Sequence, residues 1–136
     1  MADKLMKLEI VTPDHQELSC ECTSVVVKTT SGEVGFLANH APLIAGLVPH
    51  VLRYTDGDKQ EGHVAVGGGF VEVRDNVVSV LAPSAELPAE IDYDRARHSK
   101  DRAEKRLAQK SGDVDMARAQ AALYRSLARL QLEKYL

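Results

Sequence analysis

The sequence predicts a mainly β, α+β fold in which an N-terminal antiparallel β-sandwich is followed by a C-terminal helical hairpin. Short runs rich in β-branched residues, separated by turn residues, fill the chain from residue 5 to about residue 82. Pro83 and Pro88 then bracket a short linker, after which apolar residues recur at helical spacing. Many short strands with no helical period between them are typical of a sandwich or a barrel.

Six strands are predicted before the linker, at residues 8–11, 23–28, 51–55, 63–66, 70–73 and 77–81. They are rich in valine and alternate in character, as half-buried strands do. The predicted hairpin turns are Asp56-Gly57 and Asp75-Asn76, because Asp, Asn and Gly tolerate positive φ.

Three consecutive glycines, Gly67 to Gly69, lie between two of these strands. A phosphate-binding loop needs a helix after its glycines, because the amides at a helix N-terminus hold the anion. Here a strand-like run follows and no Walker-type lysine is present, which excludes a P-loop nucleotide site. The glycines instead predict a bulge or a close backbone approach.

Two cysteines, Cys20 and Cys22, stand two residues apart in a β-rich stretch, so both side chains are expected on one face of a strand. Neighbouring thiols on one strand fit the disulfide dihedral badly, and two cysteines alone fall short of a zinc site. They are interpreted as inert structural thiols, with redox chemistry or adventitious metal binding as the alternative.

Two helices are predicted after the linker. Asp92 is expected to cap the first helix, which ends near Lys110. Ser111, Gly112 and Asp113 then break the helical pattern: Gly112 suits a left-handed position, and Asp113 can cap the second helix. Two helices of similar length joined by a short turn form an αα-hairpin.

The two helices differ in their faces. The second carries an apolar face made of Met116, Leu123, Leu127 and Leu130. On roughly the opposite face lie Arg118, Arg125 and Arg129. The first offers only a thin apolar stripe of Ala96, Ala103 and Leu107. The second helix can therefore dock, but the hairpin as a whole is expected to be held weakly and to change neighbours.

Charge is divided unevenly along the chain, whose net charge is −3. Residues 1–90 carry 6 Lys/Arg and 13 Asp/Glu, whereas residues 91–136 carry 11 and 7. Such asymmetry indicates that the two parts meet different partners, or that both surfaces are simply solvated. No apolar run approaches the length of a membrane span, and the first residues do not form a signal peptide.

The sequence does not suggest an enzyme. No combination of nucleophile, base and orienting residue is apparent, and no cluster of metal ligands. Four scattered histidines are interpreted as surface or turn residues: His15, His50, His63 and His98.

Residues 31–43, SGEVGFLANHAPL, closely resemble the signature loop of the epsilon subunits of bacterial-type rotary (F-type) ATP synthases. A second similar stretch is GGFVEV at residues 68–73, which continues to VVSVLA at residues 77–82. IDYDRA at residues 91–96 opens the hairpin, and GDVD at residues 112–115 lies at its turn. These matches cover essentially the whole chain in order, so the resemblance is specific.

The resemblance implies a sandwich of about ten strands at residues 1–86, which binds the gamma subunit and the c-subunit rotor ring, and a regulatory hairpin at residues 87–136. Glu33 and His40 would contact the rotor ring. The alternatives are that Glu33 is an ordinary solvated charge and that His40 orients a turn. The chain would be a non-catalytic central-stalk subunit of a proton-translocating ATP synthase, coupling rotation to ATP synthesis.

The resemblance also implies a place in the cell and a mode of regulation. The chain would lie at the cytoplasmic face of the bacterial membrane, as a monomer within the assembly and without a nucleic-acid partner. Folded down, the hairpin would permit ATP hydrolysis. Extended along gamma, the hairpin would reach the catalytic head of alpha and beta subunits. Its basic residues, Arg118 among them, would contact an acidic segment of the beta subunits, and ATP hydrolysis would be inhibited.

Some members of this family bind ATP on the folded hairpin without hydrolysing it. By resemblance, the residues of such a regulatory site are Glu86, Asp92, Arg95, Arg102, Arg125 and Arg129. No cofactor is required and no metal site is implied. Two alternatives remain: these residues stabilise the hairpin, or the chain is a free-standing ATP-sensing module.

Overall fold

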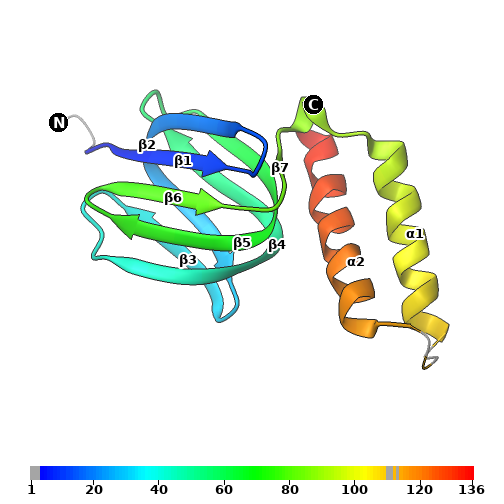
Figure 1. The fold of residues 1–136 in the computed structure, drawn as a ribbon. Coiled ribbons are helices and arrows are strands. Elements are labelled where there is room, and N and C mark those ends of the chain that lie inside the picture. Colours follow the sequence, from blue (N-terminus) through cyan, green and yellow to red (C-terminus); the bar gives the residue numbers. More distant parts are fainter. Residues whose placement is uncertain (1–3, 110–111, 113) are drawn as a thin grey trace.

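The computed structural model describes residues 4–109, 112 and 114–136. A β domain is followed by two helices (Figure 1). In chain order the elements are β1 (Met6–Val11), β2 (Gln16–Thr29), β3 (Gly32–Leu37), β4 (Leu43–Asp56), β5 (Glu61–Arg74), β6 (Val77–Leu81), β7 (Ala85–Glu86), the short 3-10 helix η1 (Pro88–Glu90), α1 (Tyr93–Gln109), α2 (Met116–Gln131) and the 3-10 helix η2 (Leu132–Tyr135).

The predicted mainly β, α+β fold is confirmed, but its strands are longer and fewer than expected. Within the described residues the order is β1-β6-β5-β4-β2-β3, with β7 beside β5 and a further β1–β2 pairing that joins the two ends. β2, β4 and β5 have 14 residues each. A strand of this length can bend and belong to both layers of a sandwich. Seven long strands are therefore found where about ten shorter ones were expected.

Three details of the strand prediction were wrong. The runs 63–66 and 70–73 belong to one strand, β5, because Gly67 and Gly69 remain paired with β4. β3 was not among the predicted strands, since residues 31–43 were identified as a signature loop, yet its residue Phe36 is fully buried. The sheet is also not wholly antiparallel, since β1 pairs with β6 in parallel.

The core of the sandwich comes entirely from residues 6–85. Its largest fully buried side chains are Leu8, Ile10, Phe36 and Leu52. In β6 only Val78 and Val80 point inward, the alternation expected of a strand with one buried face. Cys22 is buried and Cys20 packs partly against the same core, so the predicted shared face is confirmed. Burial raises the pKa of Cys22 to about 11, which keeps this thiol protonated and unreactive near neutral pH.

The predicted close approach at the triple glycine is also confirmed. Gly68 and Gly69 have φ of +101° and +99°, a region that disfavours any residue with a Cβ. A Cβ on Gly69 would overlap the carbonyl oxygen of Leu81, at the end of β6, which pairs beside β5. From this close contact the chain continues into β7 and toward the hairpin. The turn at Asp75-Asn76 is left-handed at both residues, as expected.

The helices form the predicted hairpin, with α2 between the sandwich and α1 (Figure 1). Asp92 caps α1, since its Oδ1 accepts a hydrogen bond from the Arg95 amide at 3.0 Å. α2 is capped by Asp115, whose Oδ1 accepts from the Arg118 amide. The expected helix end at Lys110, the break at Ser111 and the cap at Asp113 lie outside the described residues.

α1 is as polar as its sequence indicated. Its only buried residues are Ala96 and Ala103, so it packs on α2 through small side chains. None of the helices in the described part of the chain is long and apolar enough to cross a membrane.

Candidate functional site

The hairpin meets the sandwich through one small apolar cluster. Its buried members are Ala65, Ile91, Ala128 and Leu132, with Val51 and Tyr93 packed around them. Leu132, in the short turn after α2, is the one large side chain of this cluster with no exposed surface. This cluster is separate from the sandwich core, so the apolar contacts of the hairpin do not form part of that core.

Polar contacts surround this cluster. Arg129 Nε donates to Glu86 Oε1 at 2.6 Å, and the two side chains are 28% and 29% exposed. The ring of Tyr135 stacks on that of His63, with centroids 3.6 Å apart. An exposed ion pair of 2.8 Å between Arg97 and Glu133 ties α1 to η2. An exposed pair such as Arg97–Glu133 contributes little to docking, because solvent and salt screen it.

The prediction about the faces of α2 needs correction. Arg125 and Arg129 were placed opposite the docking face, yet Ala128 between them packs on the sandwich and Arg129 pairs with Glu86. Met116, predicted on the apolar face, is 39% exposed. α2 is covered on two sides, by α1 and by β4 and β5, so a single apolar face does not describe it. Alanine and serine fill the close contacts instead: Ala119, Ser126 and Ala128.

The predicted nucleotide-binding residues fall into two groups. Glu86, Arg125 and Arg129 line one narrow cleft beside Gly67 and Ser84, which is too tight in the docked hairpin to hold a water molecule.

Arg95 and Arg102 lie exposed on α1, seven residues apart and so on one side of the helix. The carboxylate of Asp92 is used as the helix cap, and Arg102 Nη2 contacts Ser99 Oγ at 3.2 Å. In the described part of the chain, Glu86 and Arg129 are the two of this set whose side chains bond to each other.

The residues predicted to contact partners are spread over the surface. Glu33 lies near the start of β3 and forms an exposed ion pair of 2.8 Å with Arg53. His40 lies just beyond the other end of β3, where its Nδ1 donates to the Ala41 carbonyl at 2.6 Å and its ring meets Phe36 edge-on. Arg118 is exposed in the first turn of α2.

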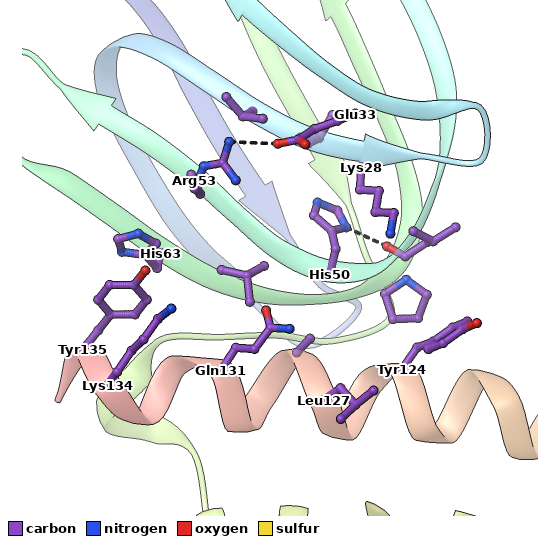
Figure 2. Close-up of a pocket in the computed structure, with 16 residues that line it drawn as sticks. Lys28, Glu33, His50, Arg53, His63, Tyr124, Leu127, Gln131, Lys134 and Tyr135 are labelled. Atoms are coloured by element: carbon purple, nitrogen blue, oxygen red, sulfur yellow. Dashed lines mark hydrogen bonds and ion pairs between the residues drawn. The ribbon is translucent and has the colours of Figure 1, made fainter.

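Two histidines contradict the interpretation as surface or turn residues. His50 in β4 and His63 in β5 are 8% and 9% exposed and lie under α2 (Figure 2). His50 Nδ1 bonds to the Val48 carbonyl at 2.6 Å, and burial lowers the pKa of His50. The period-two pattern could have found them, because both stand among residues of buried strands.

A cluster of titratable groups at the root of the hairpin also escaped the sequence. The Glu17 side chain is 3% exposed, with His15 Nε2 at 2.5 Å from its Oε2. Burial and a hydrogen bond to Glu90 in η1 raise the pKa of Glu17, and the same bond lowers the pKa of Glu90. Glu17 of β2 and Glu90 of η1 therefore lie close together where the linker meets the sandwich. No local pattern signals a contact between residues so far apart in the chain.

The sandwich also presents an exposed apolar patch. Phe70 and Leu81 are directly opposite each other on β5 and β6, and are 61% and 56% exposed. Ile44 of β4 lies diagonally beside Phe70 on the same face and is 71% exposed. Contiguous exposed apolar side chains mark binding surfaces. Since Val71 and Val73 point inward, the alternation around Phe70 could have placed it outside.

Two family models match this chain. A model described as the beta-sandwich domain of the ATP synthase delta/epsilon chain matches residues 5–88. A second, described as the long alpha-helix domain of the same chain, matches residues 89–132. Together they span both parts of the fold.

Close relatives match over nearly their whole length. The ATP synthase epsilon chain of Nitratidesulfovibrio vulgaris (strain DP4) is 51% identical over 130 residues, which cover 96% of each chain. That of Desulfitobacterium hafniense (strain Y51) is 47% identical over 123 residues, or 90% of this chain and 92% of the relative. That of Shouchella clausii (strain KSM-K16) is 45% identical over 130 residues.

Solved structures share the fold. A chain of the Euglena gracilis mitochondrial ATP synthase (OSCP/F1/c-ring) superposes with a TM-score of 0.80 at 22% identity, covering 93% of this chain and 79% of that one. A chain of the Tetrahymena thermophila mitochondrial ATP synthase (central stalk/c-ring) gives 0.59 at 15% identity, covering 99% and 98%. With both family models matched and bacterial relatives so similar along their full length, the chain belongs to the delta/epsilon family of ATP synthase subunits, as a non-catalytic epsilon chain.

Proposed function

We propose that this epsilon chain is part of the central stalk of a proton-translocating ATP synthase and that its hairpin restrains ATP hydrolysis when it leaves the sandwich. The observation that carries the proposal is the small and separate docking cluster around Leu132. Full burial of one such side chain stabilises by about 1.5–3 kcal/mol. A hairpin held by a few such contacts is within reach of a competing partner.

The exposed patch of Ile44, Phe70 and Leu81 supports a protein partner for the sandwich. It lies wholly on β4, β5 and β6, so it is available whether or not the hairpin is docked. We assign this face to the gamma subunit, the stalk partner that the family implies. Glu33 and His40, at the two ends of β3, remain the proposed contacts with the rotor ring.

The charge of the hairpin supports a different partner for the helices. Residues 91–136 carry 11 Lys/Arg against 7 Asp/Glu, and Arg118 is exposed. An extended hairpin would bring this excess of positive charge to an acidic surface of the beta subunits, which lie next to the alpha subunits in the catalytic head. Electrostatic attraction would favour that contact, and added salt would weaken it. The assembly would lie at the cytoplasmic face of the membrane, with this chain as one copy attached peripherally through the complex.

Deletion of residues 88–136 tests this proposal. The truncated chain should fold, because the sandwich core comes entirely from residues 6–85, and it should still bind gamma through the exposed patch. It should no longer inhibit hydrolysis. The measurement is ATPase activity of the catalytic complex reconstituted with full-length or truncated chain, with gamma binding measured in parallel. Equal inhibition by the two chains would refute a regulatory hairpin.

Copurification of the tagged chain with the gamma subunit addresses the alternative of a free-standing ATP-sensing module. The full-length relatives above are epsilon chains of ATP synthases, so this alternative has lost its basis. The alternative would be supported again if the tagged chain recovered no gamma subunit from its own membranes.

ATP is also proposed as a regulatory ligand of the docked hairpin, since Arg125, Arg129 and Glu86 line one cleft. Two guanidinium groups one helical turn apart suit phosphate binding. Arg129 already donates to Glu86 at 2.6 Å and the cleft has no free volume, so a phosphate group would have to displace this carboxylate and widen the cleft. Arg95, Arg102 and Asp92 on the α1 side remain proposed contacts for the rest of the nucleotide.

Replacing Arg125 and Arg129 together with alanine should weaken ATP binding by about a hundredfold or more, because each charge-assisted hydrogen bond contributes roughly 1.5–3 kcal/mol. Isothermal titration calorimetry of the isolated chain measures this. Arg118→Ala is the matched control, since Arg118 is an exposed arginine of the same helix outside the cleft. Equal binding heats for the double variant and the parent would rule the site out.

A further inference from the structure

A groove of about 550 Å³ lies between the sandwich and the C-terminal half of α2 (Figure 2). One wall comes from β2, β3, β4 and β5, and the other from α2 and η2. Its volume falls within the range of about 300–1,000 Å³ that is usual for small-molecule sites. Ala128 borders both this groove and the cleft of Glu86, Arg125 and Arg129, but none of these three residues lines the groove.

The groove is long, and an apolar strip runs through a lining that also contains polar residues. It extends along the helix from Tyr124 to Tyr135, roughly 16 Å at a rise of about 1.5 Å per residue. Between these aromatic ends Val48, Val51 and Leu127 form the apolar strip, and polar residues such as His50 and Gln131 lie beside it. An apolar strip of this length suits an extended hydrocarbon chain, and the polar residues beside it suit a polar head group.

The charged groups of the groove favour an anion. Among the described residues that line the groove, one is acidic, Glu33, and three carry a permanent positive charge, Lys28, Arg53 and Lys134. Arg53 pairs with Glu33 at 2.8 Å, and the ammonium of Lys134 lies 5.2 Å from the centre of the Tyr135 ring. The third cation, Lys28, has no ion pair within the described residues.

His50 adds an unmet hydrogen-bonding need beside Lys28 (Figure 2). Its Nδ1 bonds to a carbonyl oxygen and must therefore carry the proton, which leaves Nε2 as the free ring nitrogen. Nε2 is buried without a hydrogen-bond partner. An acid group would supply that partner, as a carboxylate facing an imidazolium or as a carboxylic acid facing a neutral ring.

We propose that this groove binds an organic carboxylate with an extended apolar tail, its acid group held by Lys28 and His50 and its tail lying along α2. The bound molecule contacts both the sandwich and the hairpin, so the complete site exists only when the hairpin is docked. By linkage, binding therefore stabilises the docked arrangement. The site is a second regulatory input, independent of ATP.

The test uses the full chain and sodium decanoate below its micelle concentration. Isothermal titration calorimetry should show one decanoate bound per chain, and Lys28→Gln should weaken binding by about tenfold. NMR titration of the His50 ring should show that decanoate raises its pKa, because a nearby anion favours the imidazolium. Hydrogen exchange of α2 amides should slow when decanoate binds.

Lys59→Gln is the matched control, an exposed lysine in the β4–β5 turn outside the groove, and it should bind decanoate like the parent. Both substitutions replace an exposed lysine, so the fold should be unaffected. Decanol and decylammonium carry the same tail without the carboxylate and should bind at least tenfold more weakly.

Four results would each overturn the proposal: no binding of decanoate, equal binding of decanol, equal binding by the Lys28 variant, or binding that leaves the His50 pKa and α2 exchange unchanged. These outcomes are independent of whether the hairpin inhibits hydrolysis. The proposed carboxylate site can therefore be refuted without affecting the proposed function, and the proposed function can be refuted without affecting the site.

Discussion

Leu132→Asp is expected to release the hairpin from the sandwich. Leu132 has no exposed surface and is the largest apolar contribution of the hairpin's C-terminal end to the docking cluster. Its loss removes about 2–5 kcal/mol of burial and packing, and a carboxylate at this position would be unpaired. A change of 3 kcal/mol corresponds to more than a hundredfold in the docking equilibrium. Hydrogen exchange should show loss of protection in α2 and unchanged protection in β6.

Leu136→Asp is the control for this experiment, because Leu136 is 73% exposed and four residues away. It should leave α2 protection unchanged. In the assembled enzyme, a hairpin that is released more easily should reach its inhibitory position more often, so Leu132→Asp should lower ATP hydrolysis. If α2 in Leu132→Asp exchanges as slowly as in the parent, the cluster around Leu132 does not hold the hairpin.

The sequence predicted the fold class well because its two halves differ in hydrophobic period. Valine-rich alternation in segments such as Val77–Leu81 marks strands without ambiguity, and that strand was predicted at its observed bounds. Periodicity could not show that β5 continues through Gly67–Gly69, since glycine has no side chain and so does not show which face of a strand is buried. It also could not show the parallel β1–β6 pair, which depends on how distant segments meet.

The candidate site was predictable only where its residues are local. The Asp92 cap follows from a short-range pattern and is confirmed. The docking of α2 was misjudged because Ala128, a small residue, makes the close contact that leucines were expected to make. Contacts such as Glu86 with Arg129 join segments 43 residues apart, and the periodicity of either element carries no information about the other.

Gly69→Ala is expected to produce a large loss of stability in the sandwich. Gly69 has φ of +99°, which strains an L-residue, and a Cβ there would overlap the backbone oxygen of Leu81, which cannot move as a side-chain end can. We expect a loss of about 3 kcal/mol or more, or roughly 10 °C in the unfolding temperature. Thermal unfolding followed by circular dichroism measures it.

Two other glycines separate the causes of this loss. Gly32 has φ of +124° but open space around a Cβ, so Gly32→Ala should show backbone strain alone, about 1 kcal/mol. A Cβ on Gly35 would meet its nearest neighbour at 3.9 Å, an ordinary contact, so Gly35→Ala should be near neutral. Because Leu81 leads into β7, a shift at Gly69 should also move Glu86 away from Arg129 and loosen the hairpin. Equal unfolding temperatures for Gly69→Ala and Gly35→Ala would show that the close contact between Gly69 and Leu81 adapts freely. The position of the hairpin would then not depend on this contact.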